Sequence, residues 1–216
     1  MKILKSIFYL QLLEDNLVTQ YNENFPWRIF VSMNVPYIIG KELSEIKNLV
    51  PDSYKHLLKW VDLSLIHCTL IFIGDSVENQ VISVREVIEN LKFDYEINTF
   101  VEEFGFLPNQ NHPNVFIAKL NQSPEMFHLY NQLRSKLLEN NFKLQKKFIP
   151  HITIARIRKN YSKKELKSFI SFFQKMEYLK KISFQFKKIS VIRSILKTEG
   201  PDYKILSEIS IQSDNT

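Results

Sequence analysis

The segments Ile66-His67-Cys68-Thr69-Leu70 and Pro150-His151-Ile152-Thr153-Ile154 repeat one pattern: histidine, an apolar residue, threonine and an aliphatic residue. Both segments lie in apolar runs that are typical of buried strands. Alternate residues of a strand face opposite sides, so the histidine and threonine of each copy share one face and the apolar residues face the core. Two such pairs across a cleft would supply two groups that titrate near neutral pH and two hydroxyl donors, which suffices for acid–base catalysis without a metal.

The sequence around the two motifs is also repeated. The motif histidines are 84 positions apart, and the flanking elements recur at nearly the same offset. Periodicity predicts strands at 28–34, 65–73, 95–106, 115–120, 148–157, 182–196 and 203–211 and helices at 36–50, 78–91, 124–140 and 162–178. An internal duplication of this size predicts two similar lobes, roughly 25–110 and 111–216, related by an approximate twofold axis. The two His/Thr pairs would face each other across that axis.

Charge is unevenly distributed along the chain, whose net charge is +6. Residues 141–200 hold 16 Lys and Arg residues and three acids, a net charge of +13, so the rest of the chain carries −7. A basic half of this kind favours a polyanionic partner such as RNA. The alternative is a lysine-rich composition with solvated helix faces, because 23 of the 29 basic residues are lysine.

Composition limits the class of protein. Its 216 residues are 44% hydrophobic and 24% charged, so we expect one folded unit over residues 25–216, which we take to be a monomer. Cys68 is the one cysteine of the chain, which excludes an internal disulfide and fits a reducing, cytoplasmic location. Residues 1–24 have a short apolar run but no small-residue cleavage site, so we interpret them as an N-terminal extension and not as an export signal.

The motifs and their flanks resemble the 2H phosphoesterase superfamily and, within it, the RNA 2′,3′-cyclic phosphodiesterases (2′-5′ RNA ligase-like proteins). Residues 67–74, His-Cys-Thr-Leu-Ile-Phe-Ile-Gly, are similar to the first motif of that family, and residues 148–156, Phe-Ile-Pro-His-Ile-Thr-Ile-Ala-Arg, to the second. Residues 28–30 resemble its opening strand, and Ser194 with residues 200–203 its tail. One His-x-Thr is weak evidence, but two with these flanks at this spacing are specific. The resemblance runs from about Trp27 to the C-terminus and implies an α+β fold, with an antiparallel-rich sheet and outer helices in each lobe and a central cleft.

The resemblance also implies an activity: metal-independent hydrolysis of a 2′,3′-cyclic phosphate at an RNA end, without a cofactor, leaving a 2′-phosphate. His67 and His151 would be the catalytic acid and base, in an order that the sequence leaves open. Thr69 and Thr153 would donate hydrogen bonds to the non-bridging phosphate oxygens. The same site could run in reverse as a weak 2′-5′ RNA ligase. The partners would be RNA ends or nucleotides with a 2′,3′-cyclic phosphate, with no membrane and no obligate protein partner.

Further residues are candidates for contacts with the substrate. Arg156 is a candidate phosphate ligand, although strand alternation from His151 turns it away from the cleft unless the strand ends or bulges near Ala155. Phe148 could stack on a base or belong to the core. Tyr203 and Arg28 are weaker candidates for the cleft lining. We interpret the other histidines as surface or turn residues, and no spacing typical of a metal site occurs; these are His56, His112 and His128.

Two other functions are compatible with the sequence. A non-catalytic RNA-binding module would keep the fold and the basic face, but binding alone does not need two imidazoles beside hydroxyls. A phosphodiesterase acting on a small cyclic nucleotide or an ADP-ribose cyclic phosphate would keep the chemistry. Steep salt dependence of binding would favour a polyanionic RNA chain over such a small substrate.

Overall fold

The computed structural model describes residues 25–93, 95–144, 147–175, 181–198 and 200–211. The predicted extension, 1–24, lies outside the described residues. The strands are β1 (Trp27–Asn34), β2 (Leu58–Trp60), β3 (His67–Ser76), β4 (Ile97–Leu107), β5 (Val115–Leu120), β6 (His151–Ile157), β7 (Ser183–Phe186), β8 (Lys188–Lys197) and β9 (Gly200–Ser210). The helices are α2 (Tyr37–Ser44), α3 (Asp52–Lys55), α4 (Glu78–Glu89), α5 (Pro124–Glu139) and α6 (Lys163–Lys175), with short 3₁₀ helices η1 (Glu45–Leu49) and η2 (Leu63–Leu65).

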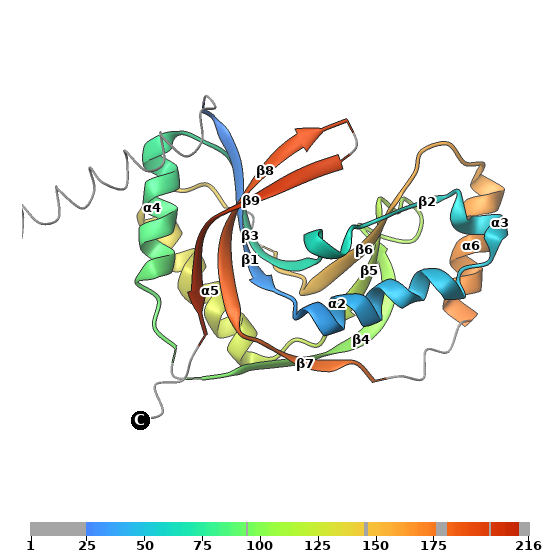
Figure 1. Ribbon diagram of the computed structural model, residues 1–216, viewed down its shortest axis with the longest axis horizontal. Helices are drawn as coiled ribbons and strands as arrows, with labels where there is room; N and C mark the ends of the chain where they lie inside the picture. The colour runs from blue at the N-terminus through green and yellow to red at the C-terminus, as the bar shows by residue number, and fades with distance from the viewer. Residues whose placement is uncertain (1–24, 94, 145–146, 176–180, 199, 212–216) are drawn as a thin grey trace, which may run out of the picture.

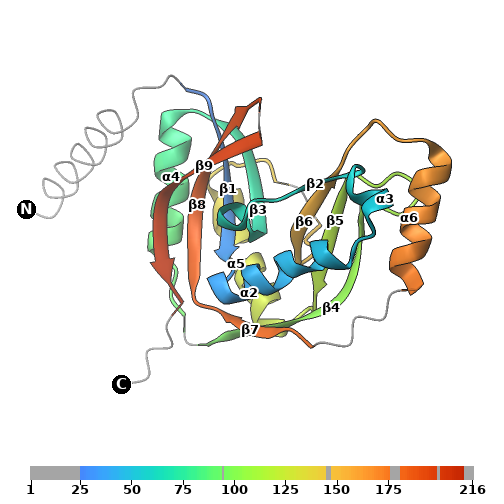
Figure 2. The ribbon, with the colours of Figure 1, turned by 45° about the vertical axis from the view of Figure 1, so that its right-hand side comes forward.

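The strands form one antiparallel sheet that curls around the motif strands. Their order is β7-β4-β5-β6-β3-β1-β8-β9, and β2 pairs with β6 off this path. The two motif strands, β3 and β6, lie next to each other at the middle, and the sheet turns away on both sides of them (Figure 1). Helices α4 and α5 cover the outer face on one side and α6 covers it on the other, as the turned view shows (Figure 2). The predicted α+β architecture with outer helices is confirmed.

Strands are exchanged between the two halves of the sequence. Strand β4 precedes the midpoint of the chain but pairs with β5, whereas β8 and β9 follow it but join the sheet beside β1. Each side of the sheet therefore contains strands from both halves. The division at 25–110 and 111–216 stays a prediction about the sequence repeat, and it does not separate the two sides of the sheet.

The predicted elements are present with small shifts at their ends. Strand β5 has the predicted bounds, and the long strand predicted at 182–196 is divided into β7 and β8. The sequence did not predict α3, β2 or η2, because each is only three or four residues long and too short to show a period. Among these elements, β2 matters most for the site, because it extends the sheet beside the second motif.

Local signals explain why the outer helices form. Ser123 caps α5, with its side chain accepting a hydrogen bond from the Met126 N–H, and Pro124 occupies the first turn. Ser162 and Glu165 form reciprocal side-chain-to-backbone bonds at the start of α6. The apolar face of α6 then packs on β4 and β5 through contacts between phenylalanine rings. Burial of these rings holds the outer layer against the sheet.

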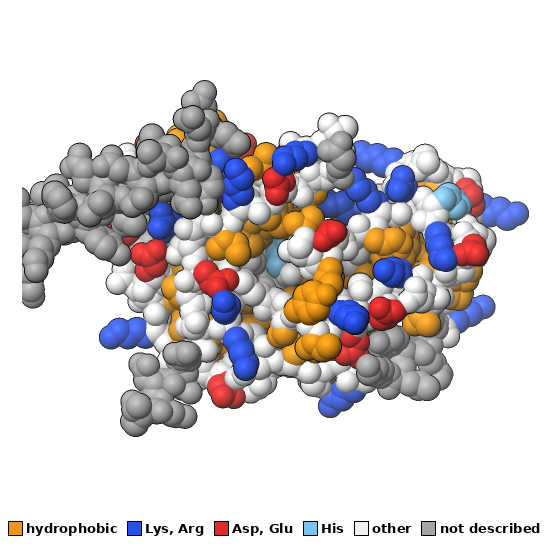
Figure 3. Space-filling model, viewed as in Figure 1, with side chains coloured by type: hydrophobic (Ala, Val, Ile, Leu, Met, Phe, Trp, Pro, Cys, Tyr) orange, Lys and Arg blue, Asp and Glu red, His pale blue; other side chains and the backbone are white. Residues whose placement is uncertain are grey.

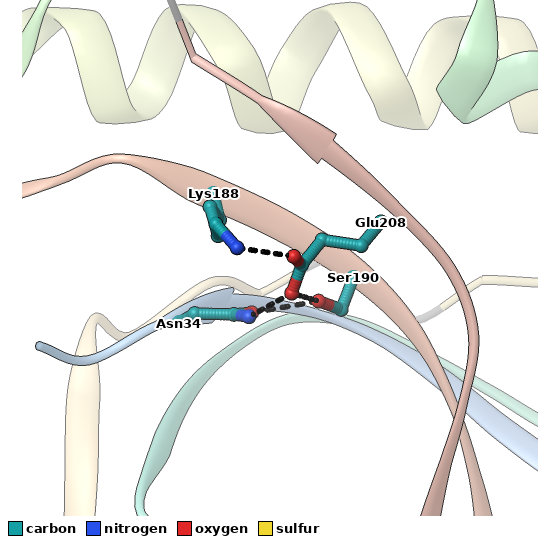
Figure 4. A network of polar contacts seen from close by, with 4 residues as sticks. All are labelled: Asn34, Lys188, Ser190 and Glu208. Carbon is teal, nitrogen blue, oxygen red and sulfur yellow. Dashed lines mark hydrogen bonds and ion pairs between the residues drawn. The ribbon is translucent and has the colours of Figure 1, made fainter. Parts of the chain in front are cut away.

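A polar network joins the end of β1 to β8 and β9 (Figure 4). The amide nitrogen of Asn34 donates to Glu208 at 2.8 Å, and the Ser190 hydroxyl donates to the amide oxygen of Asn34 at 2.9 Å. Lys188 forms an ion pair with the same Glu208 carboxylate. Since Asn34 is the cross-strand partner of His67, the network anchors the strand beside the first motif.

Within the described residues, none of the helices combines the length and apolar character that a membrane crossing requires.

Candidate active site

The two motifs present their histidines and threonines as predicted. Cys68 and Ile152 are fully buried on the core face, whereas the motif histidines and threonines are partly accessible on the other face. Cys68 is the register partner of Ile152 across β3 and β6. Because neighbouring residues of a strand alternate in direction, this register sets His67 beside Thr153 and Thr69 beside His151.

Each imidazole is held by the same type of hydrogen bond, from its Nδ1 to a main-chain carbonyl oxygen. Nδ1 of His67 lies 2.7 Å from the Leu65 carbonyl oxygen, and Nδ1 of His151 lies 2.7 Å from the Ile149 carbonyl oxygen. A carbonyl oxygen can only accept, so Nδ1 carries a proton in each ring and Nε2 is the nitrogen that can exchange one. In the neutral ring of His67, Nε2 accepts a hydrogen bond from the Thr69 hydroxyl at 3.1 Å.

A bulge occurs at the same place in both motif strands. One extra residue, Leu70, lies in β3 opposite β1, and one extra residue, Ile154, lies in β6 opposite β5. Each bulge reverses the alternation of the residues that follow it. Arg156 therefore lines the cleft despite its odd spacing from His151, and Phe72 lines it at the corresponding position of the first motif.

His67 and the two motif threonines open into a cavity of about 800 Å³ between the two sides of the sheet. Figure 3 shows a histidine side chain in a hollow at the middle of this face, bordered by hydrophobic groups and by basic side chains to one side. His67, Thr69, Thr153 and Arg156 line this cavity. A neighbouring cavity of about 300 Å³ contains His151, and both cavities share Thr69 and Phe72.

The remaining predicted residues divide between the cleft and the core. Arg28 and Tyr203 both line the larger cavity, and Tyr203 packs edge-on against the His67 ring with centroids 5.4 Å apart. Phe148 is buried, and its ring stacks on Tyr130 with centroids 4.8 Å apart. Its position favours the core interpretation over base stacking, although its ring also borders the smaller cavity. The three histidines interpreted as surface residues are exposed: His56, His112 and His128.

Burial and charge both act on the imidazoles. Burial lowers the pKa of His67 below its usual value, and the neighbouring His151 and Arg156 lower it further, while its bond to Leu65 opposes them. Burial also lowers the pKa of His151, against the bond to Ile149. The register of Cys68 with Ile152 places the two rings on the same face of neighbouring strands. Burial likewise raises the pKa of Tyr203, although the positive charges of Arg156 and Arg28 lower it.

The structure adds cleft residues that sequence reasoning missed. Phe72 is 38% exposed, and the Arg28 guanidinium carbon lies 4.8 Å from its ring centre. Lys59 and Trp60, on the short strand β2, line the larger cavity next to Arg156. The offset of 84 residues between Phe72 and Arg156 could have indicated the first of these. Nothing in the local sequence indicated β2.

Comparisons with known proteins show which proteins this chain resembles. A family model described as LigT like Phosphoesterase matches residues 119–203, which include the second motif. An RNA 2′,3′-cyclic phosphodiesterase of Thermotoga maritima is 26% identical over 187 residues, 86% of this chain and 96% of the relative. One of Archaeoglobus fulgidus is 29% identical over 182 residues, 83% of this chain and 97% of the relative.

The chain is similar to the LigT-like phosphoesterases.

Solved structures of other proteins share the fold of this chain. TT0787 of Thermus thermophilus superposes with a TM-score of 0.67 at 21% identity, over 87% of this chain and 100% of that one. E. coli LigT complexed with phosphate superposes with a TM-score of 0.62 at 16% identity, over 87% of this chain and 99% of that one. The curled sheet with its central motif strands is therefore a fold shared across distant sequences.

Proposed function

We propose that this protein hydrolyses the 2′,3′-cyclic phosphate of an RNA end to a 2′-phosphate, with His67 and His151 as its acid–base pair. The observation that carries the proposal is the matched pair of Nδ1 bonds to the Leu65 and Ile149 carbonyl oxygens. The same bond is made by the neutral ring and the charged ring, so either imidazole can take or give a proton at Nε2 without moving. The relatives named RNA 2′,3′-cyclic phosphodiesterases support this choice of substrate.

The reaction exchanges one phosphorus–oxygen bond for another. The oxygen of a water molecule attacks phosphorus, and its proton passes to Nε2 of the neutral imidazole. The bond from phosphorus to the ribose 3′-oxygen breaks, and Nε2–H of the charged imidazole protonates that oxygen. The products are a 2′-phosphate and a free 3′-hydroxyl. Exchange of protons with solvent restores the starting charges.

Burial lowers the pKa of both histidines, and His151 and Arg156 lower that of His67 further. Each ring is therefore readily neutral, as a base must be, and the partner ring acts as the acid in its protonated form.

Threonine and arginine side chains would stabilise the charge that grows on the non-bridging oxygens. Thr69 and Thr153 donate hydroxyl hydrogen bonds from the two motifs, and Arg156 adds a fixed positive charge. Tyr203 lines the same cavity as Arg156 and packs edge-on against the His67 ring. Run in reverse, with the roles of the histidines exchanged, the same arrangement would join RNA ends through a 2′-5′ bond.

The site requires one chain only, so we propose a monomer, and the single reduced cysteine fits a cytoplasmic location. The test of the function is turnover of a short oligonucleotide 2′,3′-cyclic phosphate between pH 5 and 8 with EDTA present. The expected product carries a 2′-phosphate. Absence of turnover across that range would exclude the proposed reaction and leave the RNA-binding module as the better interpretation.

A further inference from the structure

The short strand β2 places a lysine beside the phosphate-binding arginine. Lys59 of β2 is the antiparallel register partner of Arg156 of β6. Directly opposed residues of an antiparallel pair point to the same face of the sheet, so both basic side chains project into the cleft. Both line the larger cavity.

Lys59 also reaches the opposite wall of the cleft. Its Nζ lies 3.7 Å from the position that a Cβ atom on Gly200 would occupy, at the tip of the β8–β9 hairpin. Gly200 has a φ of +142°, which favours glycine and keeps this position free of a side chain. The lysine is therefore close to the tip of the hairpin as well as being the register partner of Arg156.

The described side chains that line the cavity carry a net positive charge. Four are basic and two are acidic: Arg28, Lys59, Arg156, Lys197, Asp62 and Asp202. Because a cyclic phosphate carries one negative charge, a net charge of +2 on these side chains would favour a second anionic group nearby.

We infer that Lys59 binds the phosphodiester one nucleotide upstream of the cyclic phosphate, and so selects RNA ends over mononucleotides. This inference rests on the proposed function and specifies its substrate. The second phosphate is the first chemical feature that distinguishes an RNA end from a nucleoside 2′,3′-cyclic phosphate. A lysine next to the arginine that faces the terminal phosphate is placed to bind it.

The experiment compares kcat/KM for a dinucleotide with a terminal 2′,3′-cyclic phosphate and for the nucleoside 2′,3′-cyclic phosphate. In Lys59→Ala the ratio of the two values should fall about tenfold, as expected for one lost charged contact. The salt dependence for longer RNA should also lessen, by about 0.7 in the logarithmic slope. Lys59→Arg should keep the ratio, and so should Lys92→Ala, which removes an exposed lysine outside the cavity lining.

Each outcome either supports or overturns the proposed role of Lys59. A ratio that is unchanged in Lys59→Ala, or a loss that is equal for both substrates, overturns the inference but leaves the proposed function standing. If the unmodified protein turns over neither substrate, the proposed function fails and the role of Lys59 fails with it.

Discussion

Cys68 of β3 lies directly opposite Ile152 of β6. Both side chains are fully buried, so the residues on either side of them must face the cleft. This register brings the two imidazoles and the two threonine hydroxyls to the same face of the sheet. A shift of one residue in either strand would turn the motif histidines and threonines into the core.

Replacement of either motif histidine should abolish most of the activity. His67→Ala and His151→Ala should each lower kcat/KM at least about 100-fold, because each removes one of two proton transfers. The matched control is His56→Ala, an exposed histidine outside the cleft, which should retain activity. Thermal melting should show that all three variants fold. A histidine variant that kept about a tenth of the activity would contradict the paired roles.

The dependence of activity on pH should be bell-shaped. Both histidines have a pKa below the usual value, so the maximum of kcat/KM should lie on the acidic side of pH 6.5. A bound phosphate favours the charged imidazole and raises its pKa, so the profile of kcat should lie at higher pH than that of kcat/KM. Initial rates at constant ionic strength test both points. A profile that only rises or only falls would argue against two coupled imidazoles.

Stability should also respond to the burial of these rings. A histidine whose pKa is lowered by folding binds its proton more readily in the unfolded chain, so protein stability should fall as the pH drops below about 6.5. Urea unfolding at several pH values measures this slope. The double variant His67→Asn/His151→Asn should show a weaker dependence between pH 5 and 7. An identical slope in the double variant would mean that other groups cause it.

Arg156 and Tyr203 should differ in importance. Arg156→Ala should lower kcat/KM about 100-fold, because it removes a charge that faces the transition state, and Arg156→Lys should recover part of the loss. Tyr203→Phe keeps the ring packed on His67 but removes a hydroxyl from the cavity that Arg156 also lines, so a loss below about tenfold is expected. Arg85→Ala, on the outer helix α4, is the control. Equal losses of kcat/KM in Arg156→Ala and Arg85→Ala would exclude a specific role of Arg156 in the reaction.

Cys68 should behave as a small core residue. Burial raises the pKa of its thiol to about 12, so thiol reagents should modify it only after unfolding. Cys68→Val should change the free energy of unfolding by less than about 1.5 kcal/mol, since the volume is nearly kept. Cys68→Ser should cost about 1–3 kcal/mol, because a hydroxyl would be buried in an apolar site. Denaturant unfolding measures both, and a stable serine variant would contradict the packing argument.

Local sequence was sufficient to predict the motif strands, the outer helices and the family. The polar and apolar residues alternate along His67, Cys68, Thr69 and Leu70, so adjacent residues show which side of the strand faces the core. In the helices, apolar residues at a period of 3.6 show the same thing. The repeat at 84 residues then predicted that the two faces would meet. These signals lie within short segments, so they can be read without knowing the partner strands.

Tertiary structure alone decided which further side chains enter the cleft. The bulges at Leu70 and Ile154 turn Phe72 and Arg156 inward, and a bulge is defined by the register of a neighbouring strand. Strand β2 exists because β6 offers an edge for it to pair with, and that pairing sets Lys59 opposite Arg156. The exchange of β4 and β8 between the halves also depends on contacts distant in sequence. Periodicity shows which side of an element each side chain faces. The pairing of elements determines whether that side lines the cleft, the core or the outer surface.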